Sequence, residues 1–266
     1  MTSEALHHWI LVLDVERYST RSDPVQRSLR TAMYDVFTTA FGQAGLNGHG
    51  VVTEDRGDGV LVLVPPTVSP VRLAGPFVRA LDEGLREKAA YFGPRHALRL
   101  RLAMHQGLAT RDEYGWSGDA VNTASRLVDA QPLRDVLHAA ELGHMVFAVS
   151  SSVYEGVVRH GHRGVDPAAY APMSFRTKHG ERVGAWVTVP GYSAPPVPPP
   201  AEPGLEPGGG SDSGAGAAAD AREGADRAAA PAPSPASAGP VFHIGVARGD
   251  VVGHDKNVTI HRGERR

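Results

Sequence analysis

The composition of the chain changes abruptly near residue 193, and this break limits how much of the chain can form a folded core. From residue 194 to 240 the sequence consists almost entirely of proline, glycine, alanine, serine and acidic residues, with no aromatic side chain. Such a segment buries too little apolar surface to offset the conformational entropy lost on ordering. We therefore expect three parts: a folded domain over 1–193, a disordered linker over 194–240 and a short β-prone motif over 241–266.

The overall charge and the residue types that are missing exclude several classes of protein. The formal net charge is −2 at pH 7, which gives no electrostatic reason to expect nucleic acid or an anionic membrane as a partner. The absence of cysteine excludes disulfides, thiolate metal sites and cysteine nucleophiles. The N-terminus lacks the features of a secretion signal, and its apolar run is too short to span a bilayer. We expect a cytoplasmic protein.

Strand and helix patterns alternate through residues 1–193. Short apolar or alternating runs predict strands, and apolar residues at spacings of three and four predict amphipathic helices. The expected strands cover 9–15, 59–64, 97–107, 145–150 and 182–190. The expected helices cover 25–44, 71–91, 118–130 and 151–160.

Two aspartates stand at the ends of the two most apolar strands. Asp14 closes the first strand and Asp58 opens the run GVLVLV. If these strands are neighbours, both carboxylates meet at one rim of a sheet, where they repel each other unless a cation neutralises them. A pair of divalent ions about 3.5–4 Å apart is the usual solution in phosphoryl chemistry. The alternative is a plain turn in which Asp58 accepts local backbone hydrogen bonds.

A third polar pattern lies in the sequence DAVNTASRL. Asn122 and Arg126 are four residues apart and therefore share one face of the expected helix. An amide and a guanidinium that project together suit an anionic, planar or phosphate-bearing ligand. The alternative is an ordinary solvated helix face.

Four of these segments together resemble the catalytic domains of class III nucleotidyl cyclases. The segments are LDVERYS, EDRGDGVLV, LRLAMHQG and SGDAVNTASRL, and they occur in the order and approximate spacing of that family. The region 8–190 also resembles a cyclase-related group found in actinobacteria. The resemblance implies an α+β fold of the ferredoxin-like type, with the element order βααββαβ.

The resemblance also implies a role for each of these residues. Asp14 and Asp58 would hold two Mg²⁺ or Mn²⁺ ions against a nucleoside triphosphate. Asn122 and Arg126 would orient the ribose and stabilise charge at the α-phosphate, and Lys178 would hold the terminal phosphates. In the family these sets come from different subunits, so we expect a homodimer with two shared sites.

Three further positions bear on which nucleotide the protein would use as substrate. Glu54 stands where guanylyl cyclases carry a carboxylate that accepts hydrogen bonds from guanine, so GTP is the favoured substrate. The partner position for base reading is Gly115, which has no side chain, and a phosphate-binding arginine of the family is replaced by Leu108. These departures leave two alternatives open: cyclisation of a pyrimidine nucleotide, and nucleotide binding without catalysis.

The histidines show no metal-binding spacing on a helix, so no histidine metal site is expected. We expect a hydrogen-bonded structural role for His105 at the end of its strand. His7 and His8 precede the first expected strand, and we expect both to be solvated.

The C-terminal segment VFHIGVARGDVVGHDKNVTIH regains β-branched and aromatic residues and can form two or three short strands. Its position after a disordered linker resembles short bacterial amyloid-like signalling motifs that recruit effector proteins. Alternatives are an unstructured tail or a strand that docks on the edge of the sheet. A second hypothesis for the whole chain follows: a catalytically silent, nucleotide-binding adaptor whose tail self-assembles or recruits an effector.

Overall fold

The computed structural model describes residues 4–177 and 180–197. The predicted motif over 241–266, and all but the first four residues of the predicted linker, lie outside the described residues. The assignments of linker and motif therefore stay predictions. Among the described residues, no helix is both long enough and apolar enough to cross a membrane.

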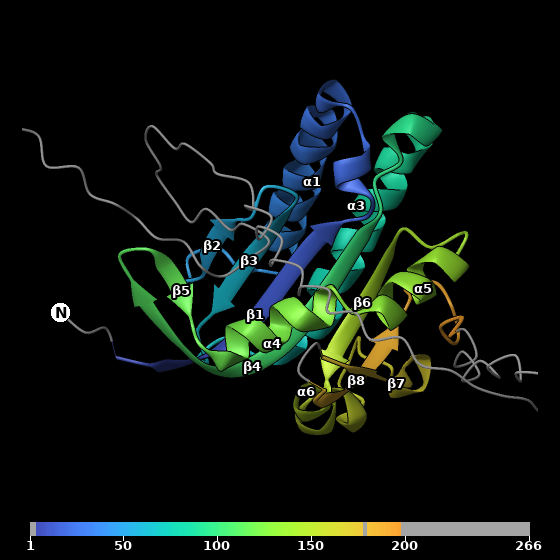
Figure 1. The fold of residues 1–266 in the computed structure, drawn as a ribbon. Helices are drawn as coiled ribbons and strands as arrows, with labels where there is room; N and C mark the ends of the chain where they lie inside the picture. The colour runs from blue at the N-terminus through green and yellow to red at the C-terminus, as the bar shows by residue number, and fades with distance from the viewer. Residues whose placement is uncertain (1–3, 178–179, 198–266) are drawn as a thin grey trace, which may run out of the picture. The chain divides into compact units, whose positions relative to one another are not determined.

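One sheet organises the described domain (Figure 1). Its strands lie in the order β2-β3-β1-β4-β6-β8-β7, and β5 pairs with the end of β4. Neighbouring strands are antiparallel, except that β4 and β6 are parallel. The strands are β1 Leu6–Val15, β2 Val52–Asp55, β3 Gly59–Val64, β4 Leu100–Asp112, β5 Gly115–Ser117, β6 Met145–Ser150, β7 Ala171–Arg176 and β8 Arg182–Thr188.

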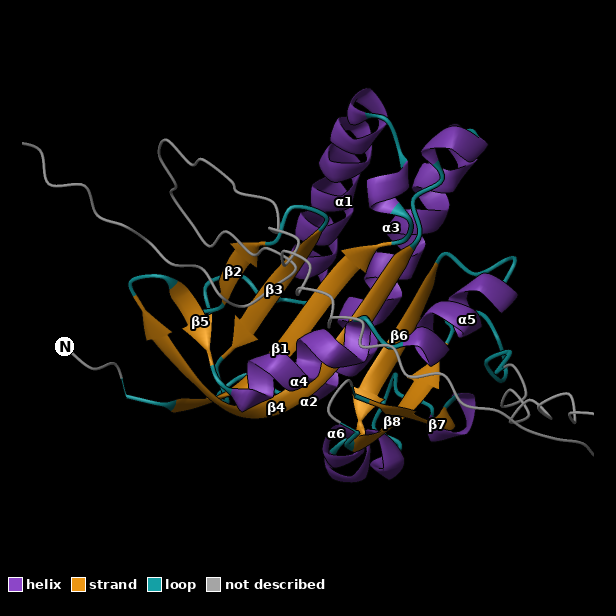
Figure 2. Cartoon of the chain, viewed as in Figure 1, coloured by secondary structure: helices purple, strands orange, loops and turns teal. Residues whose placement is uncertain are grey.

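Helices cover both faces of this sheet (Figure 2). Helices α1 and α3 pack on one face together with α6, and α4 and α5 pack on the other. The helices are α1 Asp23–Gln43, α2 Pro70–Arg72, α3 Val78–Tyr91, α4 Asp119–Val128, α5 Gln131–Ala139 and α6 Ser151–Gly156.

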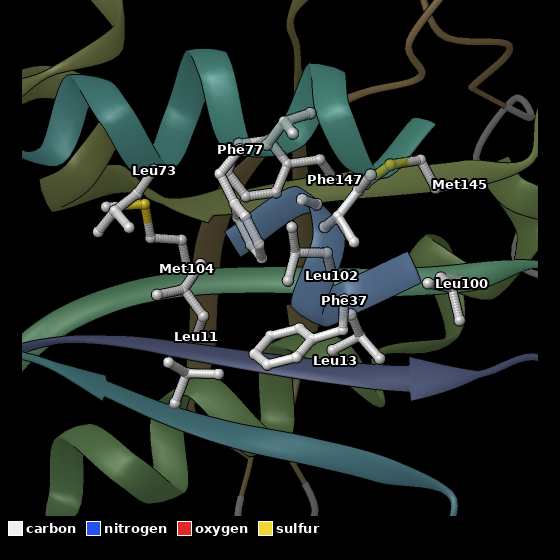
Figure 3. Close-up of a cluster of buried hydrophobic side chains, with 14 of the residues drawn as sticks. Leu11, Leu13, Phe37, Leu73, Phe77, Leu100, Leu102, Met104, Met145 and Phe147 are labelled. Atoms are coloured by element: carbon white, nitrogen blue, oxygen red, sulfur yellow. The ribbon is translucent and has the colours of Figure 1, made fainter. Parts of the chain in front are cut away.

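The side chains of β1 show how the sheet separates two cores. Leu11 and Leu13 point to the cluster that contains α1 and α3, whereas Ile10 and Val12 belong to the cluster that contains α4 and α5. Figure 3 shows the first cluster, in which Phe77 and other large side chains meet the leucines of β1 and β4. A strand that is covered on both faces needs apolar residues at every position, which explains the uninterrupted run of β3.

The expected α+β class is confirmed, and every strand and helix expected within the described residues is present, with shifted ends. The helix expected over 71–91 contains a π-helical segment, Leu73–Phe77, that accommodates Pro76, which has no backbone N–H to donate. The strand expected over 97–107 starts at Leu100 and continues to Asp112, because its last three residues pair with β5.

Four elements were not expected from the sequence: β2, β5, β7 and α5. The three strands are short and partly polar, and two of them lie at the edges of the sheet, where one face is not buried. Helix α5 did carry a signal, because Leu133, Val136 and Leu137 have helical spacing and are buried.

The expectation for His8 was wrong. His8 lies within β1 and is only 7% exposed, whereas His7 is exposed as expected. The Nδ1 atom of His8 lies 2.9 Å from the carbonyl oxygen of Leu6, and its ring packs edge-on against Trp116, with 5.0 Å between centroids. The first strand extends further towards the N-terminus than the apolar run suggested, and this extension carries His8 under the β4–β5 hairpin.

Gly59 allows β1 and β3 to approach each other at the end of the pair. A Cβ atom at this position would lie 2.1 Å from the carbonyl oxygen of Leu13, which is backbone and cannot rotate away. Replacing Gly59 by alanine would therefore force the two strands apart. We expect Gly59→Ala to lower the free energy of unfolding by about 2 kcal/mol or more, measured by urea denaturation followed by circular dichroism.

Gly93→Ala is the matched control, because a Cβ atom there meets nothing within 4 Å and Gly93 has an ordinary negative φ of −71°. We expect this control to change stability by no more than about 0.5 kcal/mol. Equal effects of the two substitutions would show that the strands do not approach as closely as described.

Candidate active site

Asp14 and Asp58 lie side by side at one end of the β1–β3 pair. In the register of the two strands, Asp14 faces Gly59, and the backbone N–H of Val15 donates to the carbonyl oxygen of Asp58 at 3.0 Å. Both carboxylates are half-buried. The condition set by the sequence, that the two strands be neighbours, is therefore met.

The two aspartates open onto a cavity of about 430 Å³. Its walls come from the end of β1 and the loop after it, from the turn before β3, from β4, and from α5 and the residue after α4. The acidic side chains that line it are Asp14, Glu16, Asp58, Asp129 and Asp135, and the basic ones are Arg17, Arg101, Arg134 and His138. A cavity with this mixture of charges can take a polyanion together with cations, which an apolar pocket cannot.

The charge of Asp14 is under strong and opposing influences. Burial raises the pKa of its carboxyl to about 7, Arg101 opposes that rise, and the negative charges of Asp58 and Asp129 add to it. Arg101 lies directly opposite Asp14 on β4 and forms an ion pair with it. The site thus concentrates negative charge where the surroundings favour the neutral acid.

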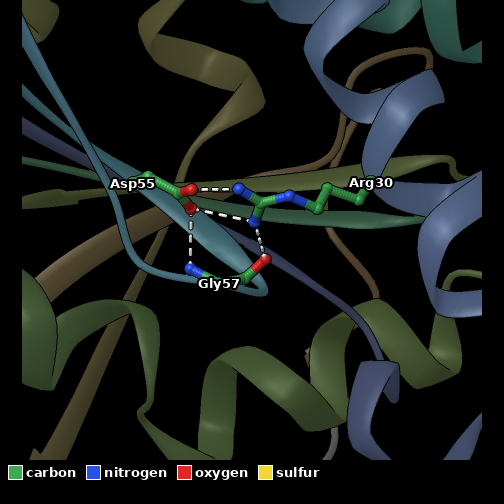
Figure 4. A network of polar contacts seen from close by, with 3 residues as sticks. All are labelled: Arg30, Asp55 and Gly57. Carbon is green, nitrogen blue, oxygen red and sulfur yellow. Dashed lines mark hydrogen bonds and ion pairs between the residues drawn. The ribbon is translucent and has the colours of Figure 1, made fainter. Parts of the chain in front are cut away.

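A polar network holds the turn that carries Asp58 (Figure 4). The guanidinium of Arg30 on α1 pairs with the carboxylate of Asp55, and its Nη1 atom donates to Oδ1 at 2.9 Å and to the carbonyl oxygen of Gly57. The backbone N–H of Gly57 donates to the same Oδ1 at 2.8 Å. Gly57 has φ of +86°, a left-handed conformation that favours glycine. These contacts fix the turn to α1 and so fix the backbone of Asp58.

Asn122 and Arg126 lie on α4, as the sequence predicts, but not at this cavity. The buried side of α4 is formed by Ala120, Val121, Ala124, Leu127 and Val128, which leaves Asn122 exposed and Arg126 half-buried. Neither side chain forms a hydrogen bond or ion pair with another described residue. Within one chain, therefore, these two residues do not join the two aspartates.

The two positions assigned to base reading lie against each other. A Cβ atom on Gly115 of β5 would lie 3.0 Å from Oε1 of Glu54 on β2, so Glu54 fills the space beside the glycine. Gly115 has φ of +131°, which favours glycine as well. Glu54 is close to Arg56, at 3.5 Å, and its Oε2 atom is buried without a hydrogen-bond partner among the described residues.

Of the other residues singled out from the sequence, His105 has the surroundings expected of a structural residue. Its Nδ1 atom lies 2.8 Å from Oγ of Ser150, and burial lowers the pKa of its ring. Leu108 is 59% exposed on β4. Lys178 lies outside the described residues, so its assignment stays a prediction. Among the described residues, no group of three or more histidine and acidic side chains is arranged to hold a metal ion.

Sequence reasoning missed the arginines of the site. Arg99 and Arg101 alternate in LRLRLAM, and such a pair in a largely apolar strand is the signal that could have identified them. Arg99 pairs with Glu16 at 3.2 Å and donates to the carbonyl oxygens of Ala140 at 2.8 Å and Gly143 at 3.0 Å, which anchors the end of α5. Arg101 pairs with Asp14.

No family model and no curated protein matches the chain. Solved structures do resemble it. An adenylate/guanylate cyclase/hydrolase from Silicibacter pomeroyi has a TM-score of 0.50 and 17% identity, over 71% of this chain and 99% of its own. The guanylyl cyclase Cya2 has a TM-score of 0.47 and 18% identity, over 71% and 94% of the two chains. The guanylate cyclase domain of RhGC from Catenaria anguillulae, solved with GTP, has a TM-score of 0.45 and 16% identity, over 69% and 96%.

At this level of identity the likeness to the Silicibacter pomeroyi protein shows the fold alone, and the two with TM-scores below 0.50 add no argument. The cyclase-type α+β fold expected from the sequence is thereby confirmed. The resemblance to an actinobacterial group stays a prediction.

The ion pair between Arg30 and Asp55 should depend on pH in a defined direction. The hydrogen bond from Arg30 lowers the pKa of Asp55 from 3.8 to about 2. Because the folded-state pKa is the lower one, the pair stabilises the fold fully above pH 4, and this stabilisation is lost as the pH falls towards 2. A double-mutant cycle with Arg30→Gln and Asp55→Asn should give a coupling energy of about 0.5–1 kcal/mol at pH 7, because the pair is partly exposed.

The exposed pair Arg79–Glu83 on α3, with 4.0 Å between charged atoms, serves as the control. A cycle with Arg79→Gln and Glu83→Gln should give a smaller coupling, about 0.3 kcal/mol. A coupling between Arg30 and Asp55 that is no larger than the control, or that grows as the pH falls below 4, contradicts the assigned role of the pair.

Proposed function

We propose that this chain is a metal-dependent nucleotidyl cyclase that converts a nucleoside triphosphate, preferentially GTP, into a 3′,5′-cyclic nucleotide and pyrophosphate. The observation that carries the proposal is the convergence of Asp14 and Asp58 at the end of two paired strands, beside a charged cavity. In this reaction the ribose 3′-oxygen forms a bond to the α-phosphorus. The bond from that phosphorus to the pyrophosphate oxygen breaks, and the hydroxyl proton passes to solvent.

The donor chemistry of the rim fits Mg²⁺ or Mn²⁺. Both ions prefer hard oxygen ligands, and Mg²⁺ is commonly held by one or two carboxylates together with substrate phosphates. Asp14 and Asp58 would hold two such ions, with the phosphates of the substrate supplying further ligands. Bound divalent ions would lower the pKa of the 3′-hydroxyl and neutralise charge on the departing pyrophosphate.

Side chains of the protein would bind the phosphates and orient the ribose. Arg17 and Arg134 line the cavity and can pair with phosphate oxygens. Lys178 is a further proposed ligand of the terminal phosphates. Asn122 and Arg126 would orient the ribose and stabilise charge at the α-phosphate from a second copy of the chain. Support for this arrangement comes from α4, where Asn122 is exposed and Arg126 is half-buried, and neither residue lines the cavity beside the aspartates of its own chain.

The preference for GTP rests on Glu54. Its buried Oε2 atom has no hydrogen-bond partner among the described residues, and the guanine edge offers two neighbouring donors, N1–H and N2–H₂. Adenine offers a donor and an acceptor on the same edge, and the acceptor would face a carboxylate oxygen unfavourably. A site that provides acceptors for one base leaves buried groups unpaired with the other.

The alternative, a silent adaptor that binds nucleotide without turnover and acts through the segment 241–266, stays a prediction. Gly115 and Leu108 depart from the family pattern and keep this alternative open. The two hypotheses differ in one measurement, because the adaptor predicts nucleotide binding with no cyclic product.

The direct test is incubation of the purified full chain with each of the four triphosphates and either Mg²⁺ or Mn²⁺, with products measured by mass spectrometry. We expect a cyclic nucleotide and pyrophosphate in equal amounts, with GTP giving the highest kcat/KM. Asp14→Asn and Asp58→Asn should each lower kcat by at least about 100-fold, because each removes a charged ligand. Absence of cyclic product from every triphosphate, with a folded protein, would rule out the enzyme.

Mixing two inactive variants tests whether the site is shared between subunits. Chains with Asp58→Asn lack one half of the site, and chains with Arg126→Ala lack the other. In a mixed dimer one of the two sites keeps both halves, so an equal mixture should recover about a quarter of the wild-type activity. A mixture of Asp58→Asn with Asp14→Asn should recover nothing, because both changes affect the same half. No recovery in the first mixture would place the whole site within one chain.

A further inference from the structure

The ion pair between Asp14 and Arg101 places a fixed positive charge at the proposed metal rim. The two residues face each other across β1 and β4, and their side chains are only 14% and 9% exposed. A buried carboxylate requires a counter-charge, because an isolated one is strongly destabilised in a poorly solvated site. Arg101 supplies that counter-charge from within the chain.

The contacts of Arg101 suggest that its guanidinium can move. Its Nε atom is buried and has no hydrogen-bond partner among the described residues, and within them the guanidinium pairs with one carboxylate, that of Asp14. Arg99, which lies two residues earlier and directly before β4, is different. That arginine donates to several backbone carbonyl oxygens as well as to Glu16, so its position is fixed from many sides.

Two neighbouring arginines have carboxylate partners other than Asp14. Arg134 pairs with Asp129 at 3.1 Å, and Arg56, which lies near Asp58, is directed to Glu54. In the folded chain, the carboxylate of Asp14 is therefore already paired with the guanidinium of Arg101, and Asp58 lies beside it. Arg101 contacts one oxygen of the Asp14 carboxylate, and a divalent ion bound to the same carboxylate would lie close to the guanidinium, so the two positive charges repel each other and compete for Asp14.

We propose that Arg101 is an internal counter-ion that a divalent cation must displace from Asp14. This inference rests on the proposed function, because it takes Asp14 as a metal ligand. Displacement has a cost, so the rim binds a bare divalent ion weakly. Arg101 also lines the cavity, so the released guanidinium is within the space that the triphosphate would fill and can pair with a phosphate. Metal and triphosphate would then bind together more tightly than either binds alone.

The test is Mn²⁺ binding without nucleotide, measured by electron paramagnetic resonance on the full chain at pH 8.5, where protons compete little for the carboxylates. Arg101→Gln should bind Mn²⁺ about 3- to 10-fold more tightly than wild type, because the competing charge is gone. Arg101→Lys keeps the charge and should remain within about twofold of wild type. Arg134→Gln removes a charge from the same cavity but not from Asp14, so a much smaller gain is expected.

Unchanged or weaker Mn²⁺ binding in Arg101→Gln overturns the proposal that Arg101 is a counter-ion competing with the metal. An equal gain in Arg134→Gln overturns it as well, because the effect would then reflect net charge alone. The metal site is tested separately, since Asp14→Asn must weaken Mn²⁺ binding in the wild-type background. If it does not, the metal site of the proposed function fails, whatever Arg101 does.

A measurement on the wild-type chain covers the case in which Arg101→Gln does not fold. In protein with ¹⁵N-labelled arginine, the Nε–H resonance of Arg101 is assigned by its absence from Arg101→Lys. Adding Mg²⁺ should shift this resonance as the guanidinium leaves Asp14, while the Nε–H resonance of Arg99 stays in place. A resonance of Arg101 that is unmoved at Mg²⁺ concentrations that saturate the rim overturns the proposal.

Discussion

The close pairing of β1 with β3 at Gly59 is the contact on which the rest of the domain depends. It brings Asp14 and Asp58 together, and it also assigns alternate residues of β1 to the two cores. A shift of the register by one residue would exchange the faces of every side chain on the strand, so that Leu11 and Leu13 would point towards α4. The same register therefore specifies the packing and the carboxylate pair. Asp14 and Gly59 form the last residue pair of the β1–β3 register, so the register that orders the core also positions the two aspartates.

The electrostatics of Asp14 and Asp58 follow from their place at the ends of two strands in a sheet that helices cover on both faces. Apolar side chains fill both faces of the sheet behind the aspartates, so the carboxylates are only partly solvated. Burial therefore raises the pKa of Asp14, and Arg101 counteracts this from the neighbouring strand. Asp55 is more exposed, and its partner Arg30 lowers its pKa instead. The pKa values of Asp14 and Asp55 thus shift in opposite directions, because the two carboxyls differ in burial and in the arginine that each one pairs with.

The sequence predicted the buried elements and the acidic rim, because both depend on patterns within short segments. Periodicity identified β1, β3, α1 and α4, and the position of Asp14 and Asp58 at strand ends indicated that they would meet. The arginine partners could not be predicted in the same way. Whether Arg101 faces Asp14, or Arg30 reaches Asp55, depends on pairing between segments that are 87 and 25 residues apart. The burial of His8 depends on a hairpin formed 100 residues later, and the short edge strands lack a fully apolar pattern.

The contact between Glu54 and Gly115 has a consequence for how this domain can change. A Cβ atom at 115 would lie 3.0 Å from Oε1 of Glu54, so a larger residue there would make the carboxylate shift, and its backbone would be strained at a φ of +131°. Substitutions at 54 and 115 are consequently not independent, because the side chain at one position limits the size of the side chain that fits at the other. A single replacement at 115 would therefore change the position of the Glu54 carboxylate as well as add a side chain beside it.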